Sequence, residues 1–511
     1  MGESRTKNTI RNTLYSFIYK LTDVFLAFFL RTLFIKALGM SYLGLSGLFT
    51  NILTVLSLME LGVGSAIIFS LYKPIAEKDN AKIVSLMRLY RQIYNCVGVV
   101  ITVVGLLLTP FLKYIINLPD NIHGIYVIYW LTIANTGVTY FLSYRRSLLM
   151  ADQRSDINSR NLIMFRIIRC IVLSIALITF RNYIIYLALD ILTTLISNIH
   201  ITFVIKKRYS YLSEVKASPL SKEEKNNILK YMTSGIFSKV GQTVVTSTDN
   251  ILISAFISTV LVGIYSNYSM ITNNLEVFVY LLFNGVTASI GNYAVTKKSG
   301  DAEQLFRKLN FVNFSIAFVL TVCLVSLMSP FVSIWAGKEY TLSFWTVIVI
   351  CVNFYIAILQ KSVENFMSAV GKMFYINRYR SLIEGGVNLF VSICLVRFTN
   401  LGITGVFLGT TVCFLCGRVW MDAHTLYKYW FNIPTSKYFK RYIFQFGLTV
   451  IVSVLGYIIS NIIFGNFGIN ILTWILSGCI LVLITCSILL LLYRHSEEYN
   501  YFLTLIKNRY K

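Results

Sequence analysis

The sequence predicts an all-α integral membrane protein with fourteen transmembrane helices. Of its 511 residues, 56% are hydrophobic and only 13% are charged, whereas a soluble domain carries roughly 25% charged residues. Apolar runs of about 20 residues recur along the whole chain, and a helix of that length crosses the hydrocarbon layer of a membrane. Transmembrane β-strands do not fit, because they would alternate apolar and polar residues.

The fourteen apolar runs are separated by short polar or charged loops. The longest loop, at about 206–230, is basic and joins the sixth run to the seventh. No secretory signal is expected, because the first run is long, carries charge and lacks a small-residue cleavage site. The predicted helices are residues 13–38, 43–72, 92–116, 123–147, 161–180, 183–205, 231–257, 261–292, 310–336, 341–369, 377–398, 402–426, 440–464 and 468–493.

The predicted helices form two sets of seven that repeat without a gap over most of the chain. One shift aligns Lys20 with Lys239 and Gly44 with Gly263, which places the copies 219 residues apart. A duplicated bundle is typical of a transporter whose site lies between the halves. The predicted organisation is an N-terminal lobe at 1–208 (helices 1–6), a cytoplasmic loop at 209–230, a C-terminal lobe at 231–426 (helices 7–12), and helices 13 and 14 with a cytoplasmic tail at 427–511.

The net charge of +24 is explained by membrane orientation rather than by nucleic-acid binding. Most Lys and Arg residues lie in the N-terminus, the even-numbered loops and the C-terminal tail. By the positive-inside rule, this asymmetry places both termini in the cytoplasm. The nine cysteines lie in apolar runs and the four histidines are scattered, so we expect no disulfide framework, metal or cofactor. The few cations near the odd-numbered loops are Lys36, Lys113, Arg181, Lys338 and Arg397.

Polar side chains follow one face of the first predicted helix and one face of the seventh, its repeat partner. Lys20, Asp23 and Arg31 share a face of the first helix because they are spaced by three and eight residues. Lys239 and Asp249 lie on the corresponding stripe of the seventh helix. Matching stripes predict a water-filled cleft between the repeats. The alternative is a set of local pairs, such as Lys20 with Asp23, that only stabilise packing.

Further charges are embedded in other predicted helices, where an ionisable group is costly and usually functional. Arg166 and Arg169 have no acid within one turn of their own helix. They either snorkel to the lipid headgroups or bind phosphate, whose oxygens match the guanidinium fork. Close opposite charges, Lys361 with Glu364 and Arg418 with Asp422, are expected to neutralise one another. The second and eighth helices carry Glu60 and Glu276.

Three motifs around the second helix resemble those of Wzx-type oligosaccharide flippases, members of the multidrug/oligosaccharidyl-lipid/polysaccharide (MOP) superfamily. They are LGMSYLG at 38–44, ELGVGSA at 60–66 and LYKPIAEKD at 71–79. The resemblance implies a MATE-like fold of two lobes in the bacterial cell membrane. It implies that an oligosaccharide unit on undecaprenyl diphosphate is turned from the cytoplasmic to the outer leaflet for capsule, O-antigen or exopolysaccharide synthesis. The polymerase and glycosyltransferases of that pathway are the expected protein partners.

These observations predict a transporter rather than an enzyme. A cation-coupled drug exporter of the same superfamily is the main alternative, but it would be expected to carry an acidic cavity. A polysaccharide polymerase or ligase would need a catalytic site in its outward loops, which look short. Peptidoglycan-precursor flippases are expected to differ by two additional helices and more cavity arginines. The predicted substrate-binding residues are Lys20, Arg31, Arg166, Arg169, Lys239 and Arg418, and the predicted ion-coupling residues are Asp23, Asp249, Glu60 and Glu276.

Overall fold

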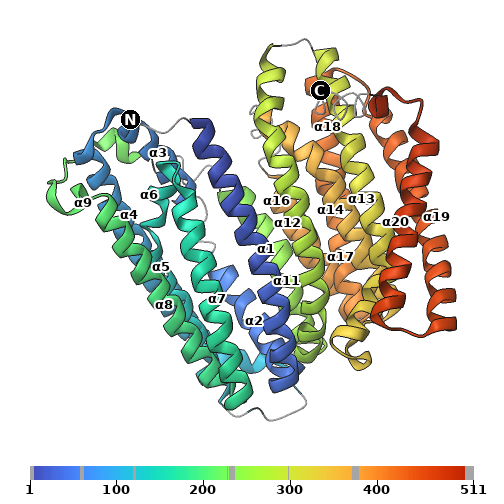
Figure 1. The fold of residues 1–511 in the computed structure, drawn as a ribbon, viewed down its shortest axis with the longest axis horizontal. Helices are drawn as coiled ribbons and strands as arrows, with labels where there is room; N and C mark the ends of the chain where they lie inside the picture. The colour runs from blue at the N-terminus through green and yellow to red at the C-terminus, as the bar shows by residue number, and fades with distance from the viewer. Residues whose placement is uncertain are drawn as a thin grey trace. The chain divides into compact units, whose positions relative to one another are not determined.

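The computed structural model describes residues 5–57, 63–118, 122, 124–226, 228, 236–296, 299–370 and 379–500. Within these ranges every regular element is a helix (Figure 1). By contacts, the chain forms two compact units, Met1–Gly263 and Ile264–Lys511. The seventh predicted helix therefore falls in the first unit by contact, and the division of the lobes at 209–230 stays a prediction.

The first unit is built from long helices that begin and end at recognisable signals. Gly39, at a φ of 83°, separates the first two helices without strain. Asp79 and Asn182 cap the helices that follow them by accepting backbone N–H groups. The helices are α1 (Arg5–Leu38), α2 (Met40–Leu56), α3 (Val63–Glu77), α4 (Asn80–Leu107), α5 (Ile125–Ser143), α6 (Arg146–Ala151), α7 (Ser155–Thr179), α8 (Tyr183–Arg208), α9 (Tyr211–Glu214) and α11 (Ile236–Phe256), with a 3₁₀ turn at Thr109–Tyr114.

The second unit contains one helix whose hydrogen bonding changes along its length. After α17 the chain continues through two π-helical segments, Leu415–Asp422 and Leu426–Phe431, on either side of α18. Such wide turns are frequent at functional sites because they redirect side chains. The helices are α12 (Thr259–Thr296, which begins in the first unit), α13 (Ser299–Trp335), α14 (Phe344–Val370), α16 (Arg380–Phe398), α17 (Ile403–Phe414), α18 (Ala423–Thr425), α19 (Ser436–Phe467) and α20 (Ile471–Tyr493), with a 3₁₀ turn at Lys338–Tyr340.

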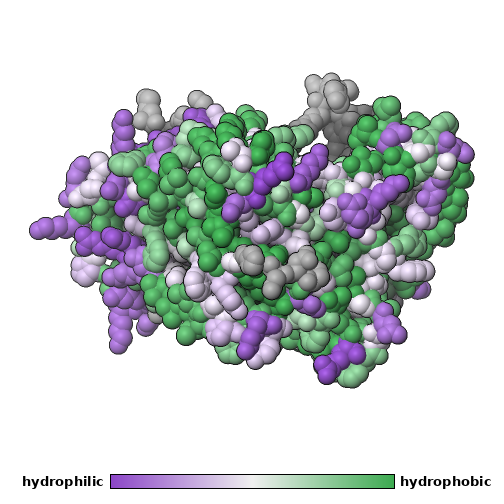
Figure 2. Space-filling model, turned by 90° about the horizontal axis from the view of Figure 1, so that it is seen from below, coloured by the Kyte–Doolittle hydropathy of each residue, from purple (hydrophilic) through white to green (hydrophobic). Residues whose placement is uncertain are grey.

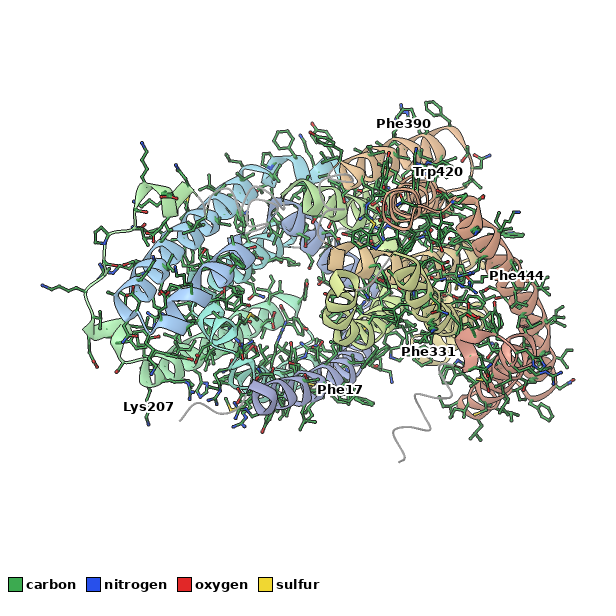
Figure 3. All side chains as sticks on the ribbon, turned by 90° about the horizontal axis from the view of Figure 1, so that it is seen from above. Phe17, Lys207, Phe331, Phe390, Trp420 and Phe444 are labelled. Atoms are coloured by element: carbon green, nitrogen blue, oxygen red, sulfur yellow. The ribbon has the colours of Figure 1, made fainter. Side chains whose placement is uncertain are left out.

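Each of the fourteen predicted spans overlaps a helix within the described residues, which confirms the all-helical membrane fold. Eleven helices in the described ranges are long and apolar enough to cross a membrane. The predicted span 43–72 corresponds to α2 and α3, between which residues 58–62 lie outside the described part. Large apolar side chains are exposed, as in Phe390 (70%) and Phe444 (57%), which lie at the outer edge of the second unit (Figure 3). Apolar side chains also cover much of the surface in Figure 2, as lipid contact requires.

Two glycines that the repeat aligns contact each other in the first unit. A Cβ atom on Gly44 would lie 2.0 Å from the carbonyl oxygen of Thr259, and one on Gly263 would lie 2.5 Å from the carbonyl oxygen of Met40. Helix α2 therefore meets the first turn of α12 at backbone distance, which only glycine permits.

The segment after α8 is docked on α4 instead of extending freely. The Tyr209 hydroxyl donates to Asp152 Oδ2 at 2.6 Å. The Ser218 carbonyl accepts from the Ser85 hydroxyl, and Lys82 forms an ion pair with Glu224. These contacts hold a segment predicted to be cytoplasmic against the first unit.

Candidate functional site

A polar cavity of about 320 Å³ lies among the helices of the first unit. Helix α1 packs along α7, and α8 packs along both α5 and α7, so these helices bring polar residues from distant parts of the chain together. The short helix α6 contributes Arg146 to the lining. The lining residues are Tyr19, Thr139, Ser143, Arg146, Asn158, Leu162, Phe165, Arg166, Arg169, Thr193, Thr194, Ser197 and Asn198.

Arg146, the first residue of α6, is the cation held by neutral groups in this cavity. Its guanidinium donates to the side-chain oxygens of Asn158 at 2.6 Å, Asn198 at 2.9 Å and Asn161 at 3.2 Å. Among the described residues no acid forms an ion pair with it. Amide oxygens orient the guanidinium without neutralising it, so its full charge is available to an anion.

Sequence reasoning missed Arg146, because it stands beside Arg145 in a basic segment that the positive-inside rule already explains. The signal that could have found it is the set of amides on the facing helices. Asn158 and Asn161 lie three residues apart on α7, and Asn198 lies on α8.

Arg166 joins the predicted pair of Lys20 and Asp23 in one cluster. Arg166 Nε lies 2.9 Å from Asp23 Oδ1, and Lys20 Nζ lies 3.5 Å from Asp23 Oδ2. The polar stripe of α1 thus meets α7 within the first unit. The predicted local pair of Lys20 with Asp23 is present, and Arg166 adds a second cation to the same carboxylate.

Arg169 pairs with an acid that the sequence analysis did not identify. Its guanidinium binds both carboxylate oxygens of Asp190 on α8, one of them at 2.9 Å, and Asn135 donates to the same carboxylate at 3.0 Å. Asp190 is 4% exposed. Arg169 is therefore paired although no acid lies within one turn of it on α7, because its partner comes from the next helix.

The electrostatic balance around this cavity is positive. The hydroxyl of Tyr186 lies in the electrostatic field of Arg31, Arg166, Arg169 and Asp190, which places Arg31 in the same region. Three arginines line the cavity: Arg146, Arg166 and Arg169. Arg166 pairs with Asp23, which Lys20 also contacts, and Arg169 pairs with Asp190. Among the described residues, Arg146 is therefore the lining cation without an acidic partner.

The second unit contains a buried charge cluster around the first π-helical segment. Arg418 Nε lies 3.4 Å from Glu384 Oε1 on α16, and Asp422 forms an ion pair with Arg380. A Cβ atom on Gly417 would lie 2.3 Å from the Glu384 side chain, so glycine makes room for that acid. Arg418 and Asp422, which were predicted to neutralise each other, each pair with a residue of α16: Arg418 with Glu384 and Asp422 with Arg380.

The same cluster extends to α12 and α14. The predicted pair of Lys361 with Glu364 is confirmed at 3.3 Å. Glu276 lies in the electrostatic field of Lys361, Arg418 and Glu364. Among the described residues of this cluster, four acids face three cations, which is the opposite polarity to the cavity of the first unit. The acids are Glu276, Glu364, Glu384 and Asp422, and the cations are Lys361, Arg380 and Arg418.

The remaining predicted site residues are placed only in part. Asp249 lies on α11 and is buried, with 6% of its surface exposed. Lys239 lies on the same helix, but its side chain falls outside the described part of the structure. Glu60 and the first residues of the 60–66 motif also lie outside it.

Comparison with solved structures defines the class of protein. The lipid II flippase MurJ in an inward closed conformation is 16% identical, with a TM-score of 0.62, and the alignment covers 94% of this chain and 99% of that one. An inward-facing multidrug MATE transporter is 15% identical (TM-score 0.60; 78% and 93% covered). A MOP superfamily transporter from Pyrococcus furiosus is 12% identical (TM-score 0.56; 81% and 93% covered). The chain therefore has the MOP transporter fold.

The sequence identifies the family within that class. Residues 9–288, more than half of the chain, match the family described as polysaccharide biosynthesis protein, and the chain belongs to this family. No curated protein sequence matches it. The expectation that two additional helices would distinguish lipid II flippases is wrong, because this chain covers nearly the whole of MurJ.

Proposed function

We propose that this protein flips oligosaccharide units carried on undecaprenyl diphosphate from the cytoplasmic to the outer leaflet of the bacterial cell membrane. The observation that carries the proposal is the cavity of the first unit, which three arginines line and in which Arg146 has only neutral partners among the described residues. A diphosphate cannot cross hydrocarbon unaided, and guanidinium groups bind its oxygens in pairs. The family assignment supports a polysaccharide pathway as the source of the substrate.

In this proposal Arg146 and Arg166 bind the diphosphate, and Lys20 contributes a third cation beside them. Asn158 and Asn198 hold the Arg146 fork in one orientation, which lowers the entropy cost of binding. Polar groups of the cavity bind the sugar while the polyprenyl tail remains in lipid. Arg31, Arg169, Lys239 and Arg418 stay candidates for substrate binding, although Arg169 and Arg418 already pair with Asp190 and Glu384.

The polarity of the cavity disfavours the main alternative. A drug exporter of the same superfamily takes cationic substrates, which an excess of positive charge repels. The alternative of a polymerase or ligase is disfavoured by the transporter fold of the chain.

Proteoliposomes test the proposal against the drug-exporter alternative. The purified protein should move a fluorescent polyprenyl-diphosphate oligosaccharide between leaflets, measured as protection from a quencher that cannot cross the membrane. It should not accumulate a cationic dye. Dye transport without translocation of the lipid-linked sugar would assign the drug-exporter function instead.

The ion coupling is proposed to use acids in both units, and Glu276 is the strongest candidate. It belongs to the cluster with one more acid than cations, so one carboxylate is available to a proton or sodium ion. Asp23 and Asp249 are the candidates on α1 and α11, and Glu60 is the candidate next to α3. Alternating access requires that the driving ion bind one state more tightly than the other.

Replacing Glu276 with Gln tests this coupling because it keeps the shape of the side chain and removes the charge. The variant should still bind the lipid-linked substrate, but its flipping rate should no longer respond to an imposed ion gradient. Glu339→Gln, in a 3₁₀ turn of the same unit, is the matched control. A gradient response equal to that of the unmodified protein would exclude Glu276 as the coupling residue.

A further inference from the structure

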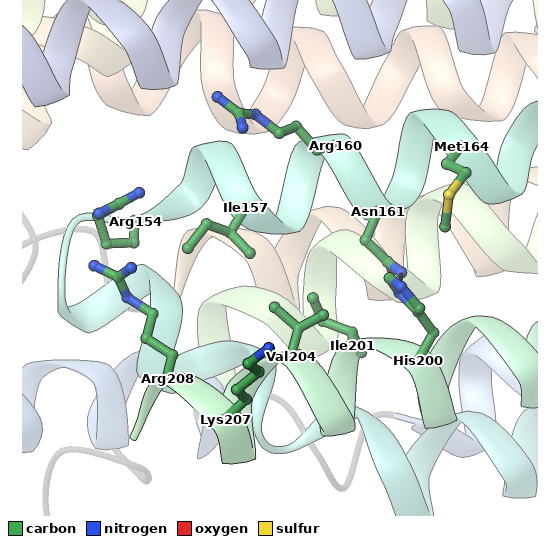
Figure 4. A pocket seen from close by; sticks show the side chains of 10 residues that line it. All are labelled: Arg154, Ile157, Arg160, Asn161, Met164, His200, Ile201, Val204, Lys207 and Arg208. Carbon is green, nitrogen blue, oxygen red and sulfur yellow. Dashed lines mark hydrogen bonds between the residues drawn. The ribbon is translucent and has the colours of Figure 1, made fainter. Parts of the chain in front are cut away.

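A second pocket, of about 540 Å³, lies between the first turns of α7 and the last turns of α8 (Figure 4). This pocket and the polar cavity have no lining residue in common. Asn161, which lines this pocket beside His200, accepts a hydrogen bond from Arg146 of the polar cavity. Helix α8 ends at Arg208 and leads into the segment predicted to be cytoplasmic. The pocket is therefore expected at the level of the cytoplasmic headgroups.

Four cations surround this pocket: Arg154, Arg160, Lys207 and Arg208. Arg154 and Arg160 already contact Asp156, at 3.1 and 4.0 Å, and Arg160 also stacks on the Tyr15 ring. Lys207 and Arg208 are exposed, and among the described residues neither forms an ion pair with an acid. Lys207 lies at the outer edge of the first unit (Figure 3).

The acid beside the pocket is fully engaged by other cations. Asp156 is 0% exposed and lies 3.2 Å from Arg11 in addition to its contacts with Arg154 and Arg160. The charge that the pocket presents to solvent and lipid headgroups is therefore set by Lys207 and Arg208, which Asp156 does not contact in the described part of the chain.

A polar pair extends the pocket toward the membrane. His200 precedes Arg208 by eight residues on α8, which places it about 12 Å further into the membrane at a rise of about 1.5 Å per residue. Its side chain is nevertheless exposed. Its Nδ1 atom lies 2.9 Å from Asn161 Nδ2, and the Asn161 side-chain oxygen accepts from Arg146 at 3.2 Å. An ionisable group exposed at this depth is costly unless a polar ligand covers it.

Apolar stripes on both helices continue from the pocket along the membrane span. On α7, Ile168, Ile171 and Ile175 are 40%, 55% and 57% exposed and share one face with Met164, which lines the pocket. On α8, Ile196 and Ile199 are 46% and 41% exposed and share one face with Phe203, which is 67% exposed. A basic pocket above a pair of exposed apolar stripes has the shape that an anionic lipid requires, with its headgroup in the pocket and its chains along the stripes.

We propose that the pocket between α7 and α8 binds the headgroup of a phospholipid that carries two phosphates, of the diphosphatidylglycerol (cardiolipin) class, in the cytoplasmic leaflet. Basic pockets between transmembrane helices on the cytoplasmic side bind such headgroups. Two phosphates match the charge of Lys207 and Arg208, whereas one phosphate would leave a cation without a partner. The bound lipid links α7 to α8 and, through Asn161, lies two hydrogen bonds from Arg146.

Native mass spectrometry of the purified full-length protein tests the proposal. Cardiolipin should bind more tightly than phosphatidylcholine, and the double variant Lys207→Gln/Arg208→Gln should bind it about 30-fold more weakly, since each cation near a membrane surface contributes about fivefold. The control Lys206→Gln/Lys216→Gln removes the same charge from exposed positions that do not line the pocket, and its affinity should be unchanged. Thermal unfolding checks that both variants are folded.

Three outcomes would overturn the proposal. Equal cardiolipin binding by both double variants would show that the pocket is not the site. Complete displacement of cardiolipin by millimolar inorganic diphosphate would identify a soluble anion as the ligand. Preferential binding of a polyprenyl diphosphate that only Lys207→Gln/Arg208→Gln weakens would assign the pocket to the lipid carrier. None of these results depends on flipping activity, so they are independent of the proposed function.

Discussion

Replacing Arg146 with Gln should weaken the binding of a polyprenyl diphosphate by about 100-fold while the protein stays folded. A hydrogen bond to a charged group contributes about 1.5–3 kcal/mol, so two bonds to a phosphate contribute at least about 3 kcal/mol. At about 1.4 kcal/mol per factor of ten, that loss corresponds to about 100-fold in affinity. Arg146→Lys keeps the charge but loses the fork, so it should cost about tenfold.

The substitution also affects folding, because Arg146 makes bonds within the protein. The bonds to Asn158, Asn161 and Asn198 have a charged donor, so each contributes about 1.5–3 kcal/mol, and the Gln amide can replace one or two of them. The variant should therefore unfold at a lower temperature, and its affinity is compared in samples that are still folded.

Microscale thermophoresis with a fluorescent polyprenyl diphosphate measures the affinity, and thermal unfolding of the same samples measures stability. The matched control is Arg145→Gln, which removes the neighbouring positive charge outside the cavity lining. Affinities that stay the same for Arg146→Gln, or that fall equally in Arg145→Gln, would refute the assignment of Arg146 to the phosphate.

Three other predictions test the fold and the orientation. Gly44→Ala should lower the unfolding temperature by several degrees, because its Cβ would lie 2.0 Å from the Thr259 carbonyl oxygen; Gly47→Ala, which meets only a side chain at 3.3 Å, should be tolerated. The hydrogen bond from Lys82 holds the pKa of Glu224 below its usual value near 4.5, so this ion pair should add modestly to docking of the segment after α8 above that pH and be lost as the pH falls further. Pepsin should cleave Glu224→Gln somewhat faster than the unmodified protein at the same pH, and this difference should disappear as the pH falls well below 4.5. A reporter fused at Lys216 should read as cytoplasmic, and an outside reading would contradict the topology.

The helices themselves were predictable from the sequence, because hydrophobicity and helical spacing are local properties. Runs of about 20 apolar residues matched helices along the whole chain. Pairs within one turn, such as Lys20 with Asp23 and Lys361 with Glu364, were also predictable, since residues three apart on a helix are neighbours.

Partners on different helices were not predictable, because one sequence does not indicate which helix faces lie together. Asp190 is separated from Arg169 by 21 residues, and Asn198 is separated from Arg146 by 52. Nothing near Arg169 in the sequence indicates that its charge is neutralised. Nothing near Arg146 indicates that its charge is retained.

The sequence by itself therefore determined the class of protein, its helices and the residues that carry charge into the membrane. The repeat aligned Gly44 with Gly263, but only the tertiary structure showed that the two glycines touch. Likewise, only packing decided that the cavity of the first unit keeps positive charge while the cluster around Arg418 keeps negative charge. The physical reason is that net polarity depends on which opposite charges lie within a few ångströms, and that distance is set by helix packing.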